Sequence, residues 1–231
     1  MKTSSDIIDK HDKEILRKLA YKVRDLASRP SEEIKKNLWY KHNSLETTRP
    51  LVFCDPHDAW KEIINENHLE CKGNLARMWE EWLRKEIFAG INLNDDRPIE
   101  PYFDIRKSYE ETDWGMKETV ISRKGKGSYI WEAPLKSYDD LEKLRFPNIK
   151  VNNEINNRNA DQANGVLGDI LKVRLRGRWW WSLGMTKILA NLRGLEQIMY
   201  DIIDYPNELK QLMEFIRDGT LAKLDFLEEN N

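Results

Sequence analysis

Hydrophobic residues recur at helical spacing in several separate stretches of the chain. Within residues 4–27 the apolar positions fall three or four residues apart with dense charge between them, which predicts an amphipathic helix. An Arg-Pro pair ends it, and a shorter predicted helix follows to about residue 41. The same spacing predicts helices over residues 73–89 and from Pro206 to near the end of the chain. The first two helices precede any predicted strand, so we expect a cap or an oligomer contact there.

Three short stretches have the pattern of central strands. Residues 51–54 (LVFC) are an apolar run between two prolines, and residues 99–105 (IEPYFDI) form the second stretch. Residues 171–176 alternate between apolar and charged side chains, as expected for a strand with one buried face. In addition, residues 119–122 and 128–132 flank a Gly-Lys-Gly sequence, which predicts a β-hairpin.

The stretch from Leu171 to Tyr205 combines both periods. Its strand is followed by a turn, Gly177–Thr186, and then by apolar residues at helical steps over residues 188–203. In parallel α/β folds, ligands bind beyond the carboxyl ends of strands, so this turn is the first place to expect a site. Its candidate ligand contacts are Trp179, Trp180, Trp181 and Met185. The alternative is that the tryptophans wedge the helix against the sheet.

The order of these elements indicates parallel α/β packing, because each central strand is followed by helical material. A closed eight-stranded barrel takes about 250 residues, whereas the 231 residues here supply three or four strand–helix units. We therefore expect an α/β fold: either an open sheet or a partial (β/α)8 TIM barrel with about the first three to four βα units. Residues 152–164 are polar and asparagine-rich, and we expect a surface loop there.

Composition narrows the classes of function. The chain is 40% hydrophobic and 34% charged with a net charge of −2, which gives no reason to expect nucleic-acid or anionic-membrane binding. The sequence contains no apolar run of about 18 residues, so we expect no membrane span. The N-terminus also lacks the apolar core of a secretory signal. Two cysteines do not make a disulfide framework, so we expect a reducing, cytoplasmic location.

Polar candidates follow the first two predicted strands. Asp104 lies near the carboxyl end of its strand, where it either contacts a substrate or pairs with Arg106 or caps a turn. Asp55 and His57 follow the strand at residues 51–54 and are candidate ligand contacts. A metal held by these two residues and Cys54 is the weaker interpretation, because zinc sites need three or four converging ligands and a second cluster is missing. The favoured alternative is that Cys54 packs and Asp55 caps the turn.

Three segments together resemble one enzyme family. They are an Arg-Pro opening at Arg49–Pro56, a strand end followed by Gly-Met in Tyr102–Met116, and an aromatic turn with Gly-Leu-Glu, aspartates and Pro-Asn-Glu in Trp181–Glu208. In these places the chain resembles the uroporphyrinogen decarboxylase superfamily, which also holds the corrinoid-dependent methyltransferases. The resemblance spans about residues 45–231, and its motifs are moderately specific.

The resemblance implies a (β/α)8 barrel whose active site lies at the carboxyl ends of the strands. By this comparison residues 1–45 are an N-terminal helical extension, and residues 46–231 are a barrel domain that covers only about the first half. The resemblance also implies that Asp104 matches a carboxylate that contacts pyrrole nitrogens. Zinc and a corrinoid are implied for the full-length family, with the zinc ligands in the second half, so we expect this part alone to lack the zinc ligands and to be inactive.

The sequence also departs from the decarboxylase pattern. The arginine-containing motif that holds substrate carboxylates after the first strand is replaced by Cys54-Asp55-Pro56-His57. This favours methyl transfer to a thiol or pterin acceptor over a carboxy-lyase of porphyrin biosynthesis, which stays open as the alternative. The expected partner is a corrinoid protein or a tetrapyrrole-like ligand. A third hypothesis is a non-catalytic half-barrel that acts only as a homodimer or with a partner chain that supplies the second half.

Overall fold

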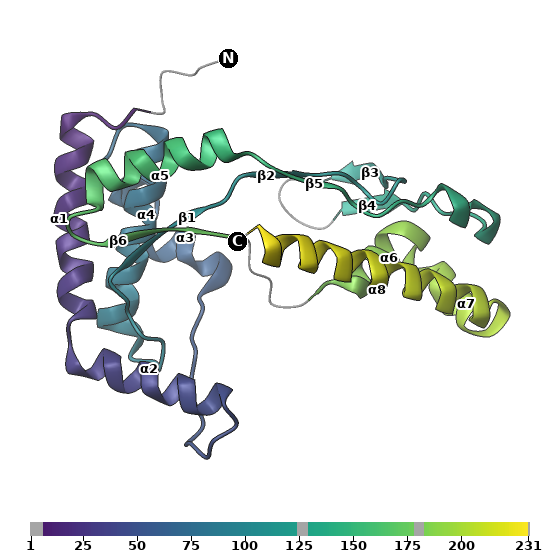
Figure 1. The fold of residues 1–231 in the computed structure, drawn as a ribbon, viewed down its shortest axis with the longest axis horizontal. Coiled ribbons are helices and arrows are strands. Elements are labelled where there is room, and N and C mark those ends of the chain that lie inside the picture. The colour runs from purple at the N-terminus through teal and green to yellow at the C-terminus, as the bar shows by residue number, and fades with distance from the viewer. Residues whose placement is uncertain (1–6, 124–128, 178–182, 231) are drawn as a thin grey trace. The chain divides into compact units, whose positions relative to one another are not determined.

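The computed structural model describes residues 7–123, 129–177 and 183–230. Helices and short strands are mixed along this part, so the fold is α/β (Figure 1). The chain divides into two compact units. The first consists of the described residues up to Ile105 together with Asn157–Leu175, and the second of Arg106–Asn156 together with the residues from Arg176 onward. None of the described helices is long and apolar enough to cross a membrane.

The first unit is a set of helices packed on a two-stranded sheet. Its elements are α1 (Lys10–Ala27), α2 (Pro30–Asn43), η1 (His57–Ala59), α3 (Trp60–Ile63), η2 (Glu66–His68), α4 (Asn74–Phe88), the π-helical turn η3 (Ala89–Leu93), β1 (Tyr102–Arg106), most of α5 (Asn153–Leu167) and β6 (Lys172–Arg176).

Helix α1 forms where the sequence predicts it and packs against α4. The Asp9 carboxylate accepts the Asp12 N–H at the first turn, which satisfies one of the free donors of the helix end. One face of the helix is buried, and its apolar residues there are Leu16, Leu19, Ala20, Val23 and Leu26. The facing residues of α4 include Trp79 and Leu83, in the same hydrophobic core. The predicted N-terminal helices therefore belong to the first unit rather than standing apart from its sheet.

Strands β1 and β6 are parallel neighbours. The Lys172 N–H donates to the Pro101 carbonyl at the start of both strands, and the Lys107 N–H donates to the Arg176 carbonyl at their ends. This pairing confirms two of the three predicted central strands as adjacent. Their connection runs through the second unit and α5, which satisfies the long crossover that parallel strands need.

The predicted strand at residues 51–54 is absent. Val52 and Phe53 are exposed, and the segment is irregular. Its backbone donors are satisfied by side chains: the Val52 N–H donates to Asp96 and the Cys54 N–H to Asp95. Carboxylates from the loop after η3 thus accept the N–H groups that a neighbouring strand would otherwise bind. A short apolar run between prolines gives no sign of these distant acceptors.

Helix α5 replaces the loop that the asparagine-rich sequence predicts. The Asn152 side chain accepts the Ile155 N–H and starts the helix. Ala163, Val166 and Leu167 then form a buried stripe, while most of the asparagines face outward. Three apolar positions at helical spacing are enough to form a helix here because α1 lies alongside. The Lys13 ammonium and the Arg17 guanidinium of α1 donate to carbonyls in the last turn of α5. The polar composition concealed this pattern.

Among the described residues, the second unit contains two antiparallel strand pairs, three α-helices and a 3-10 helix. Its elements are β2 (Tyr109–Glu111), β3 (Thr119–Arg123), β4 (Tyr129–Glu132), the 3-10 helix η4 (Tyr138–Lys143), β5 (Ile149–Val151), α6 (Met185–Arg193), α7 (Leu195–Asp204) and α8 (Pro206–Glu229). Strand β2 pairs with β5, and β3 pairs with β4 as the predicted hairpin, with an irregularity between Val120 and Ser122. The turn of this hairpin lies outside the described residues.

A glycine divides the single helix predicted over residues 188–203 into α6 and α7. Gly194 has a φ of +88°, a left-handed value that residues with a side chain rarely adopt. The break lets both helices pack beside α8: Leu189 and Leu192 of α6 join Leu212 and Ile216 of α8 in one core, and the partly buried Ile198 of α7 packs against it.

The break also forms a buried ion pair. Arg193, the last residue of α6, donates to both oxygens of Asp201 at 2.6 and 2.9 Å. Tyr138 and Gln197 donate to the same carboxylate. The remaining Arg193 nitrogen donates to the carbonyls of Leu135 and Lys136, so every charge in the group is satisfied. Burial raises the pKa of Asp201, but the hydrogen bonds from Arg193, Gln197 and Tyr138 outweigh it and hold the pKa at about 2.

Replacing Asp201 is expected to destabilise the second unit. Breaking a buried ion pair typically costs about 3–5 kcal/mol, so Asp201→Asn should lower the free energy of unfolding by that order at pH 7, measured by urea denaturation. Asp204→Asn, an exposed change on the same helix, is the control and should have little effect. The folded pKa of about 2 lies below the ordinary value of 3.8. The stabilisation is therefore complete above pH 3.8 and is lost as the pH falls toward 2. A stability gap between wild type and Asp201→Asn that stays constant down to pH 2 would contradict this assignment.

Candidate functional site

The β1–β6 sheet has one apolar and one charged face. Phe103 and Ile105 of β1 are buried, and the Phe103 ring meets Trp79 and Trp82 of α4 edge-on at centroid distances of 5.2 and 5.0 Å. Because side chains alternate along a strand, Tyr102 and Asp104 point away from this core. On β6, Val173 and Leu175 pack against the core, so Lys172 and Arg174 lie on the same outer face as Asp104.

Asp104 forms an ion pair across the two strands. Both of its carboxylate oxygens accept from Arg174, one from Nε at 2.7 Å and the other from an Nη at 3.1 Å. Both side chains are roughly one-quarter exposed, so the pair is accessible from outside. The sequence offered Arg106, two residues away, as an alternative partner of Asp104. In the structure the partner is Arg174, which is 70 residues away. A two-point arginine–carboxylate pair of this kind fixes both groups in one plane.

Tyr102 completes the charged face. The Arg174 guanidinium lies 3.6 Å from the centroid of the Tyr102 ring, and the Lys172 ammonium lies 5.9 Å from it. Burial lowers the pKa of Arg174, but its hydrogen bonds and charge interaction with Asp104 outweigh burial and raise the pKa above its ordinary value. Arg174 therefore stays charged, and the face offers a carboxylate, a guanidinium and an aromatic ring side by side. Such a set can bind a planar ligand with both hydrogen-bond donors and acceptors.

A second carboxyl group, that of Glu86, interacts electrostatically with Asp104. Glu86 of α4 is buried and pairs with Arg97. Burial raises its pKa; Arg97 opposes this effect, while the negative charges of Asp104 and Glu100 add to it. The sequence analysis did not identify Glu86, because a glutamate in a charged helix is usually exposed. No local signal distinguishes it from the other glutamates of α4.

Asp55 and His57 form a local turn and not a ligand cluster. One Asp55 oxygen accepts the His57 N–H and the Trp60 indole N–H, which is the turn-capping alternative of the sequence analysis. The His57 side chain is exposed, and its closest charged neighbour is Asp58. Neither residue contacts Asp104. In the described part of the chain, no three histidine, cysteine, aspartate or glutamate side chains converge as metal ligands.

The remaining predicted contacts come from the aromatic turn. Met185 begins α6 and packs against the hydrophobic core of the second unit. Trp179, Trp180 and Trp181 lie outside the described residues. The structure thus supports Asp104 as the centre of a polar face and gives Met185 a packing role.

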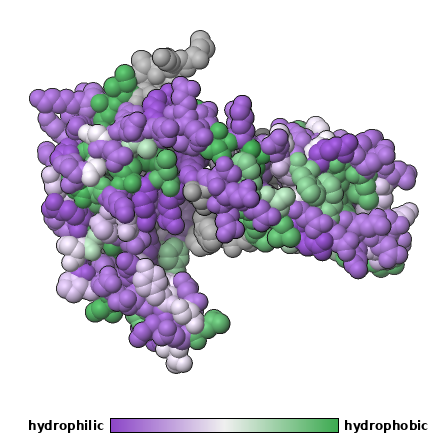
Figure 2. All heavy atoms as spheres, in the orientation of Figure 1, coloured by the Kyte–Doolittle hydropathy of each residue, from purple (hydrophilic) through white to green (hydrophobic). Residues whose placement is uncertain are grey.

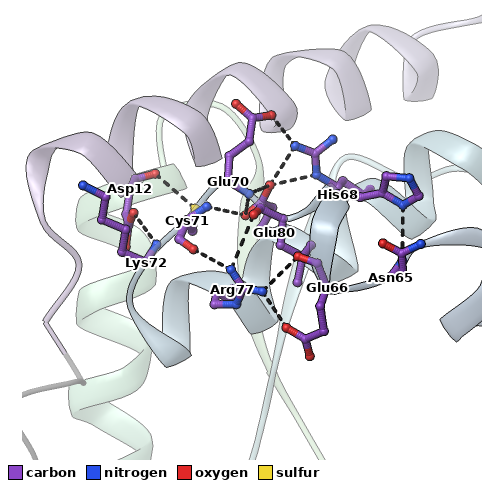
Figure 3. Close-up of polar contacts among 11 residues, drawn as sticks. Asp12, Asn65, Glu66, His68, Glu70, Cys71, Lys72, Arg77 and Glu80 are labelled. Carbon is purple, nitrogen blue, oxygen red and sulfur yellow. Dashed lines mark hydrogen bonds and ion pairs between the residues drawn. The ribbon is translucent and has the colours of Figure 1, made fainter.

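Two buried carboxylates hold an irregular loop near the start of α4 (Figure 3). Asp12 accepts the N–H groups of Lys72 and Gly73, and Glu80 accepts those of Glu70 and Cys71. Both carboxylates are essentially inaccessible to solvent. Burial raises the pKa of Glu80, but the backbone donors and Arg84 outweigh it and lower the pKa below its ordinary value. The Asp12 and Glu80 carboxylates therefore hold the loop, and the N–H groups of the loop occupy their oxygens.

The two cysteines differ in accessibility. Cys71 is buried beside Glu80 and Asp12, whereas Cys54 is exposed, so the prediction that Cys54 packs is wrong. Burial, together with the nearby carboxylates, raises the pKa of the Cys71 thiol far above its ordinary value. A thiol that does not ionise is a poor nucleophile and a poor metal ligand, so Cys71 is a packing residue.

Comparisons of the chain with protein-family models, with curated proteins and with solved structures give no match.

The thiols provide a test of the carboxylate-held loop. In the native protein one thiol, that of Cys54, is expected to react rapidly with an aromatic disulfide reagent, while Cys71 reacts only when the loop opens. Glu80→Gln removes the charge that holds the Glu70 and Cys71 amides, so it should raise the labelling rate of Cys71 by at least tenfold. Glu81→Gln breaks only a surface ion pair with Lys85 and serves as the control. Equal Cys71 rates in the two variants would show that Glu80 does not hold the loop.

Proposed function

We propose that this chain supplies the opening βα units of a partial (β/α)8 barrel resembling the uroporphyrinogen decarboxylase superfamily. In this proposal the barrel binds a corrinoid or similar tetrapyrrole-like ligand and serves methyl transfer to a thiol or pterin acceptor. Asp104 is the residue that contacts the ligand, and Arg174 positions its carboxylate.

The observation that carries the proposal is the sidedness of the β1–β6 pair. In a (β/α)8 barrel, parallel strands turn one set of side chains toward the outer helices and the other toward the barrel interior. Here Phe103 and Ile105 face the helices, and the opposite face holds Asp104 and Arg174. Charged groups on the inward side of barrel strands are costly to bury, so they favour a ligand-binding role.

The segment after residue 50 favours methyl transfer over decarboxylation. A tetrapyrrole carboxylic acid needs cationic groups to hold its carboxylates, and the resemblance places arginines there in the decarboxylases. In this chain Asp55 caps a turn instead. The nearby Arg49 is already held by both oxygens of Asp96. A corrinoid, whose rim carries neutral amides, has no such requirement.

Zinc, which activates the acceptor thiol in the methyltransferase branch by lowering its pKa, does not fit the described residues. They contain no converging ligand set, and the Cys71 thiol is buried with a raised pKa. In the proposal the zinc ligands belong to the second half of the barrel, so the 231-residue chain binds the ligand without turning it over.

A different class of function, a non-catalytic half that acts with a partner chain, is favoured by one observation in the second unit. Helix α7 exposes an apolar stripe: Leu195, Met199, Ile202 and Ile203 are each more than half exposed. Figure 2 shows further apolar atoms over the β3–β4 hairpin, where Val120, Ile121 and Ile130 are exposed. Surfaces of this kind are typical of contacts with another protein.

Ligand binding tests the enzyme proposal. The 231-residue protein is expected to bind methylcobalamin in a titration followed by calorimetry. Asp104→Asn should weaken this binding about tenfold or more, because hydrogen bonds to a charged group contribute roughly 1.5–3 kcal/mol. The control is Asp161→Asn, an exposed change on α5, with melting curves to confirm that both variants fold. Coproporphyrin bound in place of methylcobalamin would support the decarboxylase instead. Binding of neither ligand, with a stable dimer in solution, would favour the non-catalytic half.

A further inference from the structure

A cavity of about 350 Å³ lies within the first unit, separate from the charged face of β1 and β6. Its walls come from α1, from the end of α3 and the residue after it, from η2, from α4 and from η3. The volume is at the lower end of the range for small-molecule sites. The cavity has an apolar floor and a rim that carries hydrogen-bond donors.

The floor is made by aliphatic and aromatic side chains. They are Leu19 of α1, Ile63 and Ile64, and Ile87 and Phe88 of α4. All except Leu19 are partly exposed, so apolar surface faces the cavity instead of being covered by protein. The Phe88 ring is fixed by an edge-on contact with Trp60 at a centroid distance of 5.8 Å. An apolar ligand would cover this surface and gain its hydrophobic burial.

The rim carries two basic side chains. Lys22 of α1 and Arg84 of α4 both line the cavity, and no acidic residue lines it. Within the described part of the chain, the Lys22 ammonium forms no ion pair. Arg84 is held by two carboxylates, Glu80 at Nε and Nη2 and Glu70 at Nη2, and its Nη1 has no protein acceptor among the described residues. A cationic rim over an apolar floor favours a ligand with a negative head and an apolar body.

His68 adds a third donor to the rim. Its Nδ1 accepts the Asn65 N–H at 3.2 Å, so the hydrogen of the neutral ring is on Nε2. That N–H has no acceptor among the described residues. Figure 3 shows His68 extending from the loop whose next residues are held by Glu80 and Asp12. The same carboxylate, Glu80, thus fixes the loop that carries His68 and the guanidinium of Arg84.

We propose that this cavity binds a small amphipathic carboxylate, with its apolar body on the isoleucine–phenylalanine floor and its carboxylate at Lys22, Arg84 and His68. The size of the ligand follows from the volume. At about 30 Å³ for each non-hydrogen atom in a liquid, the cavity has room for on the order of ten heavy atoms. Octanoate, with an eight-carbon chain and one carboxylate, is the matching probe.

The test compares three probes of the same length by ligand-observed NMR titration. A ligand of this size in an open cavity is expected to bind with a Kd on the order of 1 mM. Octanoate should bind at least tenfold more tightly than 1-octanol, which lacks the charge, and octylammonium should bind more weakly still. Octanol binding as tightly as octanoate would overturn the role of the rim.

Two variants locate the binding. Lys22→Gln changes an exposed side chain and should weaken octanoate binding about two- to fivefold without changing octanol binding. Ile63→Glu places a negative charge at the floor and should abolish octanoate binding. Lys41→Gln, an exposed lysine on α2 that does not line the cavity, is the matched control. Octanoate affinity equal in all three variants, or no octanoate binding up to about ten times the expected Kd, would overturn the proposal.

Discussion

The first unit depends on the burial of one face of a two-stranded parallel sheet. Phe103 and Ile105 on β1, with Val173 and Leu175 on β6, complete a core that α1 and α4 otherwise share. A pair of strands has little stability by itself, so the sheet needs these helices to persist. The same requirement fixes the register of both strands, since a one-residue slip would turn the apolar face outward. Register in turn places Asp104 beside Arg174 on the outer face.

Irregular backbone in this unit is held by carboxylates instead of strands. Asp12 and Glu80 accept four backbone amides of the loop before α4, and Asp95 and Asp96 accept those of the segment at residues 52–54. Each charge is compensated by several donors, which is the condition under which a carboxylate is stable away from water. The proposed carboxylate cavity depends on this device, because Glu80 holds Arg84 as well as the loop that bears His68. In the second unit, Asp201 holds the junction of α6 and α7 through side-chain donors from Arg193, Tyr138 and Gln197.

The sequence predicted the strongly periodic elements and the position of the polar face. Helices α1, α4 and α8, the β3–β4 hairpin and strands β1 and β6 form where the patterns place them. Asp104 lies on an accessible face, but it is the middle residue of β1 and not at the carboxyl end of the strand, where the sequence predicted it. Three expectations were wrong: residues 51–54 are not a strand, the asparagine-rich segment is α5, and Gly194 interrupts the helix over residues 188–203. Partial barrel closure and methyl transfer stay proposals.

The sequence by itself determined the strongly periodic helices and which face of each is apolar. Those properties depend on residues within about two turns of one another, so a short window contains them. Only the tertiary structure decided which charges meet. Asp104 pairs with Arg174 across 70 residues, Asp12 accepts an amide 60 residues away, and Glu86 is buried although Arg84 and Lys85 precede it. Pairing of this kind depends on how helices and strands pack, and nothing in the local spacing encodes it.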